Sequence, residues 1–200
     1  MRKPFLGLPC IVVVFLFLFT SQVYGATPLE TVEKRVNAAL GVLSDPALKG
    51  DAAKEEKEKK LWTIADAMFD YPGLSKRTLG KSWKKLNPKQ QKEFTDLFSK
   101  HLGNIYLDRI MAYTDEKIVF DKERIKEDKA LVYTKIITST KEIPLDYRVV
   151  SINGDWKVYD VVIEGVSLVK NYRSQFREML KNNDPEYLLE NLRKKVKEKA

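Results

Sequence analysis

The spacing of apolar residues changes its period near residue 116, and this change limits the possible folds more than any other feature. Before that point apolar residues recur every three to four positions, as in helices that bury one face. From Ile118 to Ile163 they alternate with polar residues or form short β-branched runs, and after Gly165 the helical spacing returns. The order of helices, strands and helices predicts an α+β fold, with a curved four-stranded antiparallel sheet covered on one face by helices.

Turn signals predict the register of this sheet. Asn153-Gly154 is typical of a two-residue hairpin turn, and it would place Val149 opposite Val158 and Tyr147 opposite Asp160. A second two-residue turn at Thr140-Lys141 would place Val132 beside Val149 and Thr134 beside Tyr147. The face predicted to turn toward the helices then consists of Val132, Thr134, Ile136, Leu145, Tyr147, Val149, Trp156, Val158, Asp160 and Val162.

The helices carry recognisable start signals. Asn87 and Gln90 flank Pro88 in the pattern of an N-cap with a capping box, and a long apolar stripe follows. Ser167 and Asp184 are suited to cap two later helices. Tyr71-Pro72-Gly73 is expected to interrupt the chain before a short helix over 75–83, and the tail at about 194–200 is expected to fray.

The first 26 residues have the layout of a cleaved secretory signal peptide. Arg2 and Lys3 precede an apolar run from Leu6 to Phe19, and small residues end the segment at Gly25 and Ala26. The run is shorter than the roughly 20 residues of a membrane span, although an uncleaved anchor is the alternative. We therefore expect an exported protein with one domain over 27–200.

Export would remove Cys10, the only cysteine, and would lower the net charge from +8 to about +6. A mature chain without cysteine has no disulfide, no thiolate nucleophile and no cysteine-based metal site. An exported protein of this kind is more typical of a bacterial envelope than of a disulfide-stapled secreted domain. The basic charge fits either anionic surfaces and acidic partners or an ordinary solvated surface.

No catalytic or cofactor motif is recognisable. The sequence has no Gly-rich phosphate loop, no histidine pair and no Gly-x-Ser-x-Gly turn, and its lysines are not arranged with aromatics as nucleic-acid binding requires. His101 is the only histidine and lies on the apolar stripe of the long helix, where a structural role is the simpler interpretation. We expect no catalytic residues, no metal, no cofactor and no nucleic-acid partner.

Asp160 is unusual because it lies among strand formers on the face predicted to turn inward. A buried carboxylate without partners costs several kcal/mol or becomes protonated. Arg173, on the following helix, is the expected partner, and the pair would clamp that helix to the sheet. A ligand-facing or catalytic role for Asp160, with Tyr147 as its neighbour, and exposure through a different register are the alternatives.

The inward face is rich in apolar and aromatic side chains, which either fill the core or enclose an apolar ligand. If a ligand is bound, it should contact this face together with residues of the long helix. The candidate contacts are Phe98, Tyr106, Ile110, Val132, Thr134, Ile136, Leu145, Tyr147, Val149, Trp156, Val158 and Val162.

Two stretches of the chain carry a recognisable pattern: Leu79-Gly80 and Trp83, then Gln91, Phe94, Phe98 and Tyr106, and above all the motif W-K-V-Y-D-V…G-V-S-L-V…N-Y-R-x-Q-F from Trp156 to Phe176. With this pattern the chain resembles the MlaC family, also called the toluene-tolerance auxiliary family of ABC transporters. The likeness extends over roughly Leu61 to Leu192.

The resemblance implies an NTF2-like fold with an apolar cavity between sheet and helices. It implies a periplasmic shuttle that carries phospholipid between an outer-membrane lipoprotein complex and an inner-membrane complex of an MCE-domain protein and an ABC transporter. The lipid would be cargo rather than cofactor, and the carrier is expected to be a monomer. The alternatives are a carrier of hopanoid-related or other envelope lipids, a small NTF2-like enzyme, and an interaction module with a filled core.

Overall fold

The computed structural model describes residues 25–112 and 116–198. The predicted signal peptide, apart from its last two residues, lies outside these ranges. Among the helices in these ranges, none combines the length and the apolar character needed to cross a bilayer.

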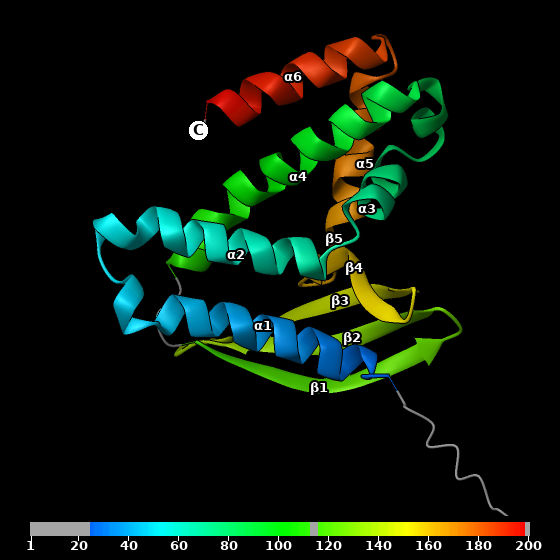
Figure 1. The fold of residues 1–200 in the computed structure, drawn as a ribbon. Coiled ribbons are helices and arrows are strands. Elements are labelled where there is room, and N and C mark those ends of the chain that lie inside the picture. Colours follow the sequence, from blue (N-terminus) through cyan, green and yellow to red (C-terminus); the bar gives the residue numbers. More distant parts are fainter. Residues whose placement is uncertain (1–24, 113–115, 199–200) are drawn as a thin grey trace, which may run out of the picture.

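A five-stranded antiparallel sheet forms one side of the molecule (Figure 1). Its strands follow one another in the order β1-β2-β3-β4-β5. They are β1 (Lys117–Lys126), β2 (Lys129–Ile137), β3 (Glu142–Ile152), β4 (Asp155–Ile163) and β5 (Val166–Ser167). The α+β prediction is confirmed, with one strand more than expected, because the two residues of β5 are too few to show an alternating pattern.

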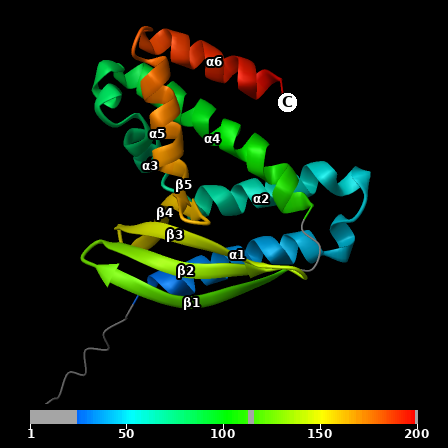
Figure 2. The same ribbon diagram turned by 180° about the vertical axis from the view of Figure 1, so that it is seen from behind.

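Helix α1 (Pro28–Ser44) lies against the inner face of the sheet, and α2 (Lys54–Met68) lies beside it (Figures 1 and 2). Two short 3-10 helices, η1 (Pro46–Leu48) and η2 (Asp51–Ala53), join them. Arg35 of α1 donates from Nη2 to both carboxylate oxygens of Asp155, each at 2.7 Å, and from Nη1 to the carbonyl of Trp156. This bidentate contact fixes α1 to the β3–β4 hairpin.

The remaining helices form a bundle beyond the β4 edge of the sheet (Figure 1). They are α3 (Tyr71–Leu79), the 3-10 helix η3 (Gly80–Lys85), α4 (Pro88–Met111), α5 (Leu168–Met179) and α6 (Pro185–Lys197). The predicted caps Asn87, Ser167 and Asp184 are confirmed. Helix α6 continues through most of the tail expected to fray.

Helix α3 begins earlier than the sequence predicts. Asp70 accepts a hydrogen bond from the backbone N–H of Gly73 at 2.9 Å, which makes Asp70 the N-cap and places Pro72 in the first turn. The Tyr71-Pro72-Gly73 stretch is therefore the start of a helix rather than an interruption, because proline is tolerated in the first helical turn.

The buried apolar residues form two clusters. One lies between the sheet and α1–α2 and includes Val132, Val149 and Val158, which have no exposed surface. The other fills the helical bundle around Phe94 and Phe98. Phe69, at the junction of α2 and α3, packs against both clusters.

Of the two turns predicted for the sheet, the one at Asn153-Gly154 is correct and the one at Thr140-Lys141 is wrong. Ile152 pairs with Asp155 across Asn153-Gly154, which both have positive φ. Between β2 and β3, however, Ile137 pairs with Glu142 across a four-residue loop, and Ile136 pairs with Ile143. Thr138 stabilises this longer loop, since its hydroxyl accepts hydrogen bonds from the N–H groups of Thr140 and Lys141. The shift is two residues, so the inward residues of β2 and β3 keep their face.

The side chain of Trp62, on α2, reaches the backbone of α4 at Gly103. A Cβ at residue 103 would lie 2.1 Å from Cη2 of Trp62, whereas a Cβ at Gly41 of α1 would meet nothing within 4 Å.

We expect Gly103→Ala to lower the free energy of unfolding by about 1 kcal/mol, because overpacking outweighs the gain in helix propensity. Gly41→Ala is the matched control and should raise it by about 0.5 to 1 kcal/mol. Urea unfolding measures both, and equal stability of the two variants would contradict the close contact of Trp62 with Gly103.

Candidate functional site

The inner face of the sheet brings together most of the side chains predicted to contact a ligand. Hydrogen-bonded register places Val132 beside Tyr147, Ala130 beside Val149, and Ile118 beside Ile136. The predicted residues on this face are Val132, Thr134, Ile136, Leu145, Tyr147, Val149, Trp156 and Val158.

A bulge in β4 reverses the faces of the last part of that strand. Val149 still pairs with Val158, but Arg148 pairs with Asp160, so that Tyr159 is an extra residue. Asp160 and Val162 therefore lie on the opposite face from the one predicted. In their place Val161 and Ile163 join the inner cluster.

The three predicted residues of α4 do not join the sheet cluster. Phe98 lies in the bundle cluster with 1% of its surface exposed, Tyr106 is half-buried, and Ile110 is 44% exposed. The helical stripe correctly indicated that Phe98 is buried, but it did not indicate which core contains it.

The residues at the centre of the inner face are buried, whereas several apolar residues packed against them are partly exposed. We call the surrounding residues the inner rim: Ile118, Phe120, Leu145, Ile163 and Leu168. Each packs against the buried cluster yet keeps partial exposure. Ile118, Phe120 and Ile163 are not among the contacts predicted from the sequence. The alternation at Ile118 and Phe120 is a signal that could have found β1, whereas the bulge conceals the role of Ile163.

Tyr147 carries a polar group into this apolar surface. Its side chain is 8% exposed, and burial raises the pKa of its phenol. Its hydroxyl forms no hydrogen bond within the described residues, and since no buried side-chain polar atom there lacks a partner, this hydroxyl reaches solvent. A solvent-accessible hydroxyl at the edge of an apolar cluster is suited to bind a polar atom of a ligand.

Asp160 is held by three donors on three elements. Its carboxylate accepts hydrogen bonds from Arg148 Nη1 at 2.7 Å and from the Ser167 hydroxyl at 2.6 Å. A third comes from the backbone N–H of Val169 at 3.0 Å, in the first turn of α5. Only 2% of Asp160 is exposed, so these partners offset the cost of burying its charge.

The expected pairing of Asp160 with Arg173 is wrong. Arg173 donates from Nε and Nη2 to the carbonyl of Arg77, the first of these at 2.8 Å, and so ties α5 to the end of α3. The bulge explains the difference, because it turns Asp160 toward Arg148 on the neighbouring strand. That Asp160 secures α5 to the sheet stays a prediction, now through Ser167 and the Val169 N–H.

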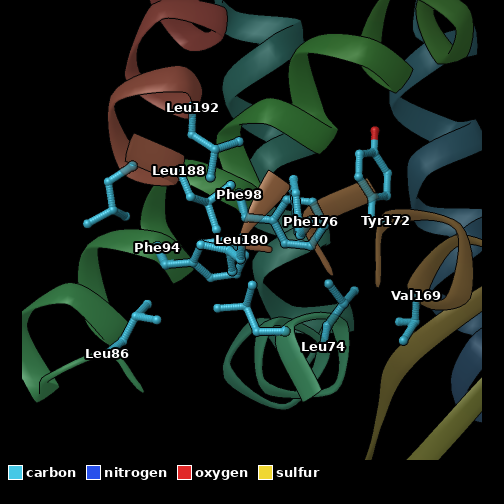
Figure 3. Close-up of a cluster of buried hydrophobic side chains, with 12 residues drawn as sticks. Leu74, Leu86, Phe94, Phe98, Val169, Tyr172, Phe176, Leu180, Leu188 and Leu192 are labelled. Carbon is cyan, nitrogen blue, oxygen red and sulfur yellow. The ribbon is translucent and has the colours of Figure 1, made fainter. Parts of the chain in front are cut away.

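Aromatic rings pack together in the core of the bundle, surrounded by leucine and valine side chains (Figure 3). Phe98 lies edge-on to Tyr172 and to Phe176, with ring centroids 5.0 and 5.4 Å apart, and it stacks on Phe94 at 5.4 Å. The Tyr172 and Phe176 side chains come from α5, so the helix that Asp160 holds also closes this core.

His101 belongs to the edge of the same core. Its ring lies edge-on to Tyr172 at 5.9 Å, and burial together with Lys195 lowers the pKa of its imidazole. In the described residues no three His, Cys, Asp or Glu side chains gather where they could hold a metal ion. The geometry therefore favours the structural interpretation of His101.

Comparison with known proteins agrees with this arrangement. A family model described as MlaC protein matches residues 33–194. The chain belongs to the MlaC family.

Two known proteins are similar to this MlaC family member, one in sequence and one in structure. The toluene tolerance protein ttg2D of Pseudomonas putida is 26% identical over 167 residues, which span 78% of this chain and 74% of that protein. The solved structure of a phospholipid-binding protein from Ralstonia solanacearum, in complex with a phospholipid, superposes with a TM-score of 0.75 at 23% identity. The superposition covers 86% of this chain and 98% of the Ralstonia solanacearum chain, so the two proteins share a fold.

The W-K-V-Y-D-V…N-Y-R-x-Q-F motif of this family member acquires a physical meaning from the structure. It spans β4, with its bulge and Asp160, and continues through Ser167 into the aromatic side chains of α5. The motif therefore contains the residues that connect the sheet to the bundle.

We expect Asp160→Ala to lower the free energy of unfolding by about 3 kcal/mol, because Arg148, the Ser167 hydroxyl and the Val169 N–H all lose their acceptor. Asp155→Ala removes an aspartate whose side chain is 44% exposed, and should cost about 1 kcal/mol or less. Chemical unfolding compares the two. An Asp160 variant as stable as the Asp155 variant would show that the carboxylate does not secure α5.

Proposed function

We propose that this protein is a periplasmic carrier that binds a phospholipid and shuttles it between membrane complexes of a bacterial envelope. The acyl chains would lie against the inner rim and the apolar face of the sheet. The lipid is cargo, and the proposal includes no catalysis, metal or cofactor.

One observation carries the proposal: an incompletely covered apolar face, in a fold shared with a protein whose structure contains a phospholipid. Burial stabilises an acyl chain by about 0.8 kcal/mol per CH2 group, so a carrier must offer apolar surface in place of the bilayer. The inner rim supplies such surface without opening the sealed centre of the cluster.

The proposed location and partners follow from the family and from the first 26 residues. A cleaved signal peptide would deliver a single domain, acting as a monomer, to the periplasm. There it would exchange lipid with an outer-membrane lipoprotein complex and with an inner-membrane complex of an MCE-domain protein and an ABC transporter. Ttg2D is named for toluene tolerance, which fits a role in maintaining the envelope.

The alternative of a small enzyme loses its only candidate pair. Tyr147 pairs with Val161 and faces the inner cluster, whereas Asp160 lies on the other face of the sheet with its oxygens occupied. An acid and a base on opposite faces cannot act on one substrate.

Mass spectrometry of an organic extract from the purified protein tests the carrier function. We expect phospholipid in near-equal molar amount to protein, and a different recovered lipid would favour another envelope-lipid carrier. A protein that copurifies with no lipid, and takes up none from vesicles, would overturn the proposal.

We expect Tyr147→Phe to reduce lipid loading several-fold with little change in stability, because the hydroxyl has no protein partner to lose. Tyr133→Phe on the outer face is the matched control and should load normally. The lipid-to-protein ratio, measured beside urea unfolding, separates the two effects. Normal loading of the Tyr147 variant would show that its hydroxyl does not meet the ligand.

A further inference from the structure

Charge is divided unequally between the two halves of the molecule. Residues 71–112 and 166–198, which contain the helical bundle, carry 17 Lys and Arg against eight Asp and Glu. Residues 26–70 and 113–165, which contain the sheet, α1 and α2, carry 16 against 20. The excess of positive charge therefore belongs to the bundle alone.

Within the bundle the excess is greatest over residues 71–92, which contain seven Lys and Arg and no Asp or Glu. In this segment Arg77 pairs with Asp70, at 3.8 Å, and Lys92 pairs with Asp96, at 2.6 Å. The other five cations are exposed and, within the described chain, form no ion pair: Lys76, Lys81, Lys84, Lys85 and Lys89.

The segment that carries these lysines is held by side-chain hydrogen bonds. Gln91 donates from Nε2 to the carbonyls of Trp83 and Leu86, both at 3.1 Å, and so fixes the end of η3. Trp83 is half-buried, lies edge-on to Phe94 at 6.4 Å, and lines a shallow hollow of about 340 Å³ with Pro72 and Pro88. We call the five lysines together with Trp83 the η3 surface.

We propose that the η3 surface docks the protein on anionic phospholipid bilayers. The ammonium group of lysine, on its flexible side chain, can follow lipid phosphates that have no fixed geometry. A half-buried tryptophan is suited to the headgroup region of a bilayer. Each lysine near such a surface adds attraction that falls off within a Debye length.

A protein partner fits the η3 surface less well. Interfaces between proteins are depleted in lysine and depend on apolar or aromatic anchors at their centre. Apart from half-buried Trp83, the η3 surface offers no such anchor, because the large exposed apolar side chains of the described residues lie elsewhere, at Ile110, Ile125, Ile152, Val166 and Tyr187.

Vesicle cosedimentation tests the proposal with the mature chain. Vesicles of about three parts phosphatidylcholine to one part phosphatidylglycerol should bind the protein at about 0.05 M salt and release it at about 0.5 M. The variant Lys81→Gln/Lys84→Gln/Lys85→Gln should reduce the partition coefficient about tenfold or more.

The matched control is Lys49→Gln/Lys126→Gln/Lys141→Gln, which removes the same charge from exposed lysines outside the bundle. It should bind within about twofold of the parent, because these lysines lie outside the proposed surface. Equal loss in the two triple variants would overturn the proposal, since net charge alone would then explain binding. Failure of the parent to bind at low salt would also overturn it and would leave an acidic protein face as the partner.

This inference does not rest on the proposed cargo, and the two can fail separately. Vesicle binding by a protein that yields no extracted lipid would support docking while the carrier function failed. Extracted lipid without vesicle binding would support the carrier function alone.

Discussion

The buried carboxylate of Asp160 joins three elements at the boundary between the sheet and the bundle. It accepts from Arg148 on β3, from Ser167 on β5 and from the first turn of α5. A buried charge is tolerated only when it is well paired, so these elements are constrained to one relative position. Helix α5 also supplies Tyr172 and Phe176 to the bundle core, so the element that contacts Asp160 is part of that core as well.

Much of this fold could be predicted from the sequence because its signals are local. The caps at Asn87, Ser167 and Asp184 and the Asn153-Gly154 turn each depend on a few neighbouring residues, and the structure contains all of them. The bulge at Tyr159 could not be predicted in this way. Tyrosine is an ordinary strand former, and only the pairing with β3 reveals that one residue is extra.

The candidate site was predictable in part for the same reason. Alternation assigned the inward residues of β2 and β3 to the correct face, even though the loop at Thr138 shifts their pairing by two. It failed beyond the bulge, where one extra residue exchanges the faces and moves Asp160 away from Tyr147. On α4 the apolar stripe shows that Phe98 is buried, but a stripe does not say against which element it packs.

The two apolar clusters meet through few side chains, and Phe69 is packed against both. Its backbone also bridges to Val158, and the adjacent Asp70 N–H donates to the Val158 carbonyl at 2.8 Å. Cooperative unfolding requires that the loss of one core destabilise the other. In this chain the contacts available for such coupling are those of the α2–α3 junction and of Asp160. Whether the two cores unfold together is therefore decided at their boundary rather than within either core.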